Sequence, residues 1–149
     1  MELICEIKWR VRYFKEAIIN LFRWFPIIVK DKDYDYWFIY EILKFKLTTQ
    51  YEHLINEDEF INTQHYVGKL KTCIKLIELL QDEKYIIERI EMSESEYFKK
   101  YPSVYRKAIK RYGEANSTKY RIFISTYNHN RARKLLFSIL EKYIENFWD

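Results

Sequence analysis

Apolar residues recur every three or four positions over most of the chain, which is the period of an amphipathic α-helix. The first stretch covers residues 4–25 and is expected to end at Pro26, which lacks a backbone donor. Its apolar positions are Ile4, Ile7, Val11, Phe14, Ile18, Leu21, Phe22 and Phe25. The pattern predicts a helix that buries this stripe in the core. A helix lying in a membrane interface is the alternative, because basic residues and tryptophans accompany the stripe.

Two further long stretches follow. The second helix is expected to begin at Asp31 or Asp33, because carboxylates suit a helix N-terminus, and to run to about Asn56. The third is expected to begin at Thr63 and to reach about Ile90. Their apolar positions are Tyr36, Ile39, Tyr40, Leu43, Leu47, Tyr51 and Leu54, then Tyr66, Leu70, Cys73, Ile74, Ile77 and Leu80.

The sharpest local signals lie between the third stretch and the C-terminal third. Ser93 and Glu96 have the spacing of a capping box, and apolar residues flank the pair as a hydrophobic staple requires. Pro102 is expected to separate this short helix from the next, which covers residues 101–112 and ends at Gly113.

The last third contains one ambiguous segment. Residues 120–127 are rich in β-branched and aromatic side chains, which is typical of a strand but also fits the first turns of a helix. We expect helix, because the sequence offers no partner strand. From Ala132 the helical period is clear, at Leu135, Leu136, Ile139, Leu140, Tyr143, Ile144, Phe147 and Trp148.

These stretches predict an all-α fold, a compact helical bundle of about four long and one or two short amphipathic helices, in one domain over residues 1–149. The composition agrees, because 149 residues of which 48% are hydrophobic can bury a substantial core. Only two Gly and two Pro occur, which excludes Gly-rich phosphate loops, dinucleotide-binding turns and β-hairpins.

Charge is distributed unevenly. The net charge is +3 over residues 1–30, −6 over 31–99 and +7 over 100–149. Such polarity indicates either solvated helix faces, or a homo-oligomer, or a partner that reads a polarised surface. Cys5 and Cys73 lie on apolar faces and are expected to be buried free thiols. The sequence shows neither a signal peptide nor a long apolar run, so we expect a cytosolic protein that does not enter a membrane.

Catalytic and metal sites are not indicated. None of the three histidines has a second His or Cys at ligand spacing. Residues 31, 33 and 35 are aspartates, as at the start of an EF-hand loop, but Tyr36 and Ile42 stand where that loop needs Gly and Glu. We therefore predict a non-catalytic protein without metal or cofactor.

Aromatic residues make up 19% of the chain and supply two candidate sites. Such side chains hold bases, nucleotides and protein partners. A small-ligand pocket is predicted at Trp24, Asp33, Tyr36, Trp37 and Tyr40. Because basic residues and tyrosines alternate in the C-terminal third, a polyanion surface is predicted at Arg106, Lys110, Arg111, Arg131, Arg133 and Lys134. The alternative is that the aromatics all belong to the core.

Five short runs carry a resemblance: RWFPII (23–28), KDKDYDY (30–36), YEILKFKL (40–47), KLLF (134–137) and the closing WD. With them the chain resembles small helical accessory proteins encoded by bacteriophages and prophages of low-GC bacteria. The resemblance implies a protein of the host cytoplasm that counters a host defence system by binding a defence protein. The alternative is a binder of the nucleotide or RNA that the defence uses, through Tyr and Trp stacking and a basic C-terminal surface.

Overall fold

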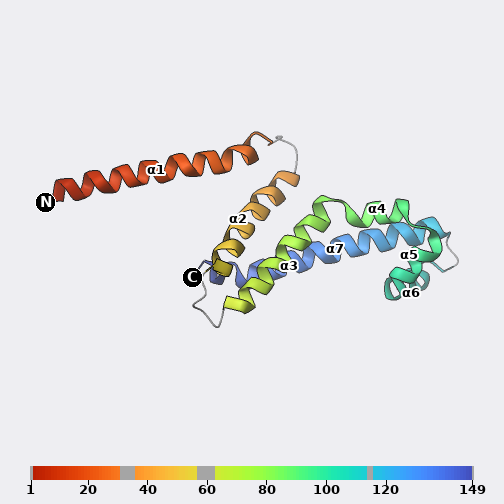
Figure 1. The fold of residues 1–149 in the computed structure, drawn as a ribbon. Coiled ribbons are helices and arrows are strands. Elements are labelled where there is room, and N and C mark those ends of the chain that lie inside the picture. The colour runs from red at the N-terminus through yellow and green to blue at the C-terminus, as the bar shows by residue number, and fades with distance from the viewer. Residues whose placement is uncertain (1, 31–35, 57–62, 114–115, 149) are drawn as a thin grey trace. The chain divides into compact units, whose positions relative to one another are not determined.

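The computed structural model describes residues 2–30, 36–56, 63–113 and 116–148, with side chains from residue 6 onward except that of Thr63. These residues form seven α-helices and no strand, which confirms the all-α prediction (Figure 1). The contacts divide the chain into two compact units, unit 1 (Met1–Leu43) and unit 2 (Lys44–Asp149). Organisation as one domain stays a prediction.

Unit 1 contains α1 (Glu2–Ile28) and the first turns of α2 (Trp37–Asn56). The prediction that α1 stops at Pro26 is wrong, because the helix continues to Ile28. A proline in the last turn removes only one helical hydrogen bond, and the Val29 N–H still donates to the Phe25 carbonyl at 3.1 Å. The aspartates expected to cap α2 lie outside the described residues.

The apolar stripe of α1 is exposed within unit 1. Its described members expose between 39% of their surface, at Ile18, and 73%, at Phe22. Burial of this stripe in a core therefore stays a prediction. Over the described residues, no helix has the length and apolar character needed to cross a membrane.

Unit 2 is assembled on α7 (Ser117–Tyr143). This helix contacts α3 (Thr63–Gln81), α4 (Lys84–Glu91), α5 (Glu94–Lys100) and α6 (Pro102–Tyr112), and Figure 1 shows it running beside α3 and α4. The largest fully buried side chains of the unit are Leu47, Leu70, Cys73, Ile77, Tyr97, Ile124, Leu136 and Phe147. The core thus follows the length of α7.

The single helix predicted from Thr63 to about Ile90 is two helices. α3 ends at Gln81, and Glu83 adopts a left-handed conformation with φ of +46° before α4 begins. The Asp82 N–H donates to the Glu78 carbonyl at 2.9 Å and closes the last turn of α3. This break changes the direction of the chain, so that α3 and α4 both contact α7. The sequence period does not reveal it, because the apolar spacing continues across the turn.

The capping box is confirmed. The Ser93 hydroxyl accepts a hydrogen bond from the Glu96 N–H at 3.4 Å, and the Ser93 N–H donates to the Glu96 carboxylate at 3.2 Å. Pro102 begins α6, as predicted. Gly113 ends α6 with φ of +59°, a conformation that side chains disfavour, and its N–H donates to the Ile109 carbonyl at 2.8 Å.

Residues 120–127 are helical, which confirms the interpretation as helix. The Asn116 side chain caps α7 by accepting a hydrogen bond from the Lys119 N–H at 3.1 Å. The expectation that this helix continues to Trp148 is wrong, because α7 ends at Tyr143 and a short 3-10 helix, η1 (Glu145–Phe147), follows. Leu136, Ile139 and Leu140 of α7 and Phe147 of η1 are buried. Leu135, Ile144 and Trp148 are exposed, although they fall on the predicted apolar positions.

Cys73 is a buried free thiol, as predicted. Burial raises its pKa to about 11, so the thiol stays protonated and unreactive at neutral pH. The side chain of Cys5 lies outside the described part of the chain.

Candidate functional site

One side of α7 carries basic, aromatic and polar residues instead of core residues. They are spaced three and four positions apart, which places them on one face of the helix. This pocket face consists of Lys119, Ile122, Phe123, Thr126, Tyr127, Asn130, Arg131 and Lys134. The buried side of the same helix consists of Tyr120, Ile124, Asn128, Ala132 and Leu136. One side of α7 therefore packs in the core, and another side lines the candidate site.

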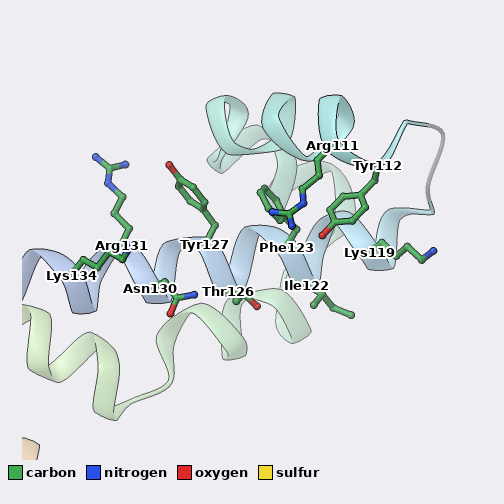
Figure 2. Close-up of a pocket in the computed structure, with 10 residues that line it drawn as sticks. All are labelled: Arg111, Tyr112, Lys119, Ile122, Phe123, Thr126, Tyr127, Asn130, Arg131 and Lys134. Carbon is green, nitrogen blue, oxygen red and sulfur yellow. The ribbon is translucent and has the colours of Figure 1, made fainter.

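The pocket face of α7 and the end of α6 together line a pocket of about 640 Å³ (Figure 2). α6 contributes Arg111 and Tyr112. The guanidinium carbon of Arg111 lies 5.6 Å from the ring centroids of both Tyr112 and Phe123. The two rings meet edge to face, with centroids 5.7 Å apart. The volume falls within the roughly 300–1,000 Å³ typical of small-molecule sites.

Tyr127 continues the aromatic row. Its ring lies 5.9 Å from that of Phe123, and Figure 2 shows it projecting from α7 between Phe123 and Arg131. Lys107 of α6 donates a hydrogen bond to the Tyr127 hydroxyl at 2.8 Å, with its ammonium 4.8 Å from the ring centroid. This hydrogen bond, with the charges of Lys107, Arg131 and Lys134, lowers the pKa of Tyr127. The electrostatic potential beside this ring is therefore positive.

The charge of the pocket has one sign. Four of its side chains are basic, and none of the lining side chains that the structure describes is acidic. Four exposed cations with no carboxylate among the described lining residues attract an anion. Three aromatic rings beside them offer faces for stacking.

The structure brings together half of the residues predicted for a polyanion surface. Arg111, Arg131 and Lys134 line the pocket. Arg106, Lys110 and Arg133 are exposed but do not line it. A pocket is lined only by the side chains that reach it, so the basic residues of a sequence segment do not by themselves define its lining.

Sequence reasoning did not single out Phe123, Thr126 or Asn130. A signal for this face was present in the sequence. Residues 119, 123, 127 and 131 are Lys, Phe, Tyr and Arg, two aromatic residues between two basic ones at four-residue steps. Helical residues at that spacing are neighbours on one face. Finding it required taking residues 120–127 as helix first.

The residues predicted for a small-ligand pocket belong to unit 1. Trp24 is half-buried on α1, whereas Tyr36 and Trp37, at the start of α2, are exposed. Tyr40 is buried and meets the Tyr36 ring edge to face at 6.3 Å. The structure thus brings Tyr36 and Tyr40 together, with Tyr40 in a packing role. Asp33 lies outside the described residues.

A second polar cluster lies in the interior of unit 2. The Tyr101 hydroxyl donates to Glu88 at 2.5 Å, and the Lys100 ammonium lies 2.8 Å from the other carboxylate oxygen. Arg121 of α7 donates to the carbonyls of Arg89 and Met92. These contacts tie α4, α5 and α7 together, so we interpret the cluster as structural.

Among the described residues, no three His, Cys, Asp or Glu side chains are grouped closely enough to hold a metal ion. No family model, curated protein or solved structure matches the chain. The chemistry of the pocket's own residues is therefore what points to its ligand.

Proposed function

We propose that the pocket between α6 and α7 binds a ligand that joins a flat ring to phosphate, namely a nucleotide, either free or within a single strand of nucleic acid. The observation that carries the proposal is the convergence of four basic and three aromatic side chains in one pocket. Bases stack on aromatic rings while phosphates pair with Lys and Arg, and every base offers a ring face.

The lining residues suggest a division of roles. Tyr112 and Phe123, with the Arg111 guanidinium over both, provide the surface for the base. Arg131 and Lys134 lie one helical turn apart and provide cations for phosphate. Thr126 and Asn130 add hydrogen-bonding groups for a sugar or a base edge.

This function is binding without catalysis. In the setting that the phage resemblance implies, the protein would capture the nucleotide or RNA that a host defence system uses. Binding of a defence protein is the other expectation from the sequence, and it stays a prediction.

The first test is fluorescence anisotropy with the full chain and two tracers, a short, end-labelled single-stranded RNA and a fluorescently labelled ATP, each with unlabelled AMP and ATP as competitors. Each neutralised phosphate of a single strand contributes roughly −0.7 to the slope of log K against log salt, so three or four contacts predict a slope of about −2 to −3. Displacement by AMP or ATP would assign the pocket to free nucleotides. RNA binding without displacement would assign it to a strand. Absence of both would refute the proposal.

A matched pair of variants tests the pocket itself. Arg131→Ala and Arg133→Ala each remove one arginine from α7, but only Arg131 lines the pocket. Because a hydrogen bond to a charged group contributes about 1.5–3 kcal/mol, Arg131→Ala is expected to weaken binding at least tenfold. Arg133→Ala should stay within about twofold, the effect of one exposed charge. Equal losses would show diffuse attraction to a basic surface.

The aromatic contribution is tested at Tyr112, which is exposed and therefore tolerates substitution. Removal of a stacking ring costs roughly 1–3 kcal/mol per base, so Tyr112→Ala should weaken binding about fivefold or more. Tyr112→Phe keeps the ring and should bind like the unaltered protein. A similar loss in both variants would mean that the hydroxyl, and not stacking, matters.

A further inference from the structure

The apolar stripe of α1 has a stricter spacing than an ordinary amphipathic helix. Without Phe22 and with Ile28 added, its members form a seam that alternates steps of three and four residues without interruption, which is the a and d pattern of a coiled-coil heptad. The a positions are Ile4, Val11, Ile18 and Phe25, and the d positions are Ile7, Phe14, Leu21 and Ile28. The pattern thus extends over the length of the helix, and Pro26 falls at a b position, outside it.

This seam is open within unit 1. From Ile7 onward its members expose between 39% and 69% of their surface. Three of the four a positions hold β-branched Ile or Val, which favours pairing with one other helix. An exposed seam of this regularity is the kind of surface that one partner helix covers.

The flanks of the seam indicate the charge of that partner. Lys8 and Lys15 stand at e positions and Arg10 at a g position, and no e or g position of α1 is acidic. The acidic residues of α1 stand elsewhere. Glu6 and Glu16, at c and f positions, pair within the helix with Arg10 and Arg12 at 2.8 and 3.0 Å.

A second copy of α1 does not fit these flanks. In a parallel pair the g residue of one helix faces the e residue of the other, which would place Arg10 opposite Lys15. In an antiparallel pair e faces e and g faces g, so with the helices aligned at their midpoints Lys15 meets Lys15, while Lys8 and Arg10 face Phe22 and Trp24 and meet no carboxylate. Like charges at these positions select against self-pairing.

We infer that α1 is a docking helix for one amphipathic helix of a partner protein, whose own apolar seam is flanked by Glu and Asp. Apolar a and d side chains would interlock along the seam, while the partner's carboxylates would face Lys8, Arg10 and Lys15. This inference rests on α1 alone and is independent of the pocket in unit 2.

The experiment uses the full chain and two designed helical peptides as probes. Both peptides carry Ile at a and Leu at d, and one has Glu at every e and g position where the other has Lys. Fluorescence anisotropy is expected to show saturable binding of the Glu peptide and at least tenfold weaker binding of the Lys peptide. Comparable affinity for both, or no binding of either, would overturn the inference.

Two variants locate the contact. Phe14→Asp places a charge in the seam and is expected to weaken binding of the Glu peptide more than tenfold. Tyr13→Asp places the same charge on the neighbouring residue at a c position, where the side chain is also exposed, and is expected to change binding less than about threefold. Equal effects of the two variants would contradict docking through the seam.

Three controls assign the seam to other occupants, and each of these outcomes would overturn the inference. If the free chain forms dimers and Phe14→Asp dissociates them, the seam is covered by a second copy of the chain. If the chain binds vesicles of anionic lipid but neither peptide, and Phe14→Asp abolishes the vesicle binding, the seam is covered by a membrane surface. If Phe14→Asp lowers the urea midpoint of the free chain and Tyr13→Asp does not, the chain itself covers the seam.

Discussion

Replacing Glu88 by Gln tests whether the interior polar cluster stabilises unit 2. Glu88 is 7% exposed, accepts a hydrogen bond from the Tyr101 hydroxyl at 2.5 Å and lies 2.8 Å from the Lys100 ammonium. Gln has nearly the same shape and keeps one neutral acceptor. The substitution therefore removes the negative charge and leaves the packing in place.

The size of the effect follows from these two contacts. A hydrogen bond to a charged group contributes about 1.5–3 kcal/mol and a neutral one about 0.5–1.5 kcal/mol, so the Tyr101 bond should weaken by about 1–1.5 kcal/mol. The Lys100 pair adds at most about 1 kcal/mol, because the lysine side chain is 44% exposed. Relief from burying a charge offsets part of the loss. We expect a net loss of about 1–2 kcal/mol in the free energy of unfolding at pH 7.

The effect must also depend on pH. Burial alone would raise the pKa of Glu88, but hydrogen bonds from Lys100 and Tyr101 and the charges of Lys100 and Lys84 hold it below its usual value of 4.5. A carboxyl with a lowered pKa in the folded state stabilises the fold above its unfolded pKa, and this contribution disappears as pH falls through the folded pKa. The difference between the two proteins is therefore complete at neutral pH and shrinks below pH 4.5.

Urea unfolding followed by circular dichroism measures both expectations, at pH 7 and at about pH 3. Glu91→Gln is the matched control, because Glu91 is exposed on the same helix, and it should cost less than about 0.5 kcal/mol. If Glu88→Gln is as stable as the control at pH 7, or its loss is the same at both pH values, the cluster does not stabilise the fold through this carboxylate.

Three further substitutions test local features of unit 2. Ser93→Ala removes the capping box of α5 and should lower the free energy of unfolding by about 0.5–2 kcal/mol in urea titrations, whereas Ser103→Ala on α6 should change little; equal effects would contradict a capping role. Gly113→Ala introduces a side chain at φ of +59° and should lower the thermal midpoint by an amount equivalent to about 1 kcal/mol or more, and an unchanged midpoint would mean that the turn relaxes. Tyr97→Phe removes a buried hydroxyl that has no hydrogen-bond partner among the described residues, so calorimetry should show a gain of up to about 1 kcal/mol; a clear loss would reveal a bound partner.

The sequence predicted the features that depend on residues close together in the chain. Helical periodicity, the capping box at Ser93 and the helix end at Gly113 are local, because each concerns residues within one or two turns. Two local expectations were wrong. A proline in the last turn does not stop α1, and the apolar spacing continues across the left-handed turn at Glu83.

The candidate site was predicted only in part, because its residues come from two helices and from one face of each. Sequence reasoning collected the basic residues of the C-terminal third without their directions. It thus included Arg133, which does not line the pocket, and left out Phe123, which does. The direction of a side chain depends on its helical phase and on which face the core occupies.

The amino-acid sequence by itself therefore determined that this protein is all-α and where the short helices on either side of Tyr101 begin and end. These properties follow from hydrogen bonds and apolar spacing within single helices. Only the tertiary structure decided that Arg111 and Tyr112 of α6 meet Phe123, Tyr127 and Arg131 of α7. Packing sets that arrangement, because burying the opposite side of α7 against the core leaves its basic and aromatic face to be completed by α6.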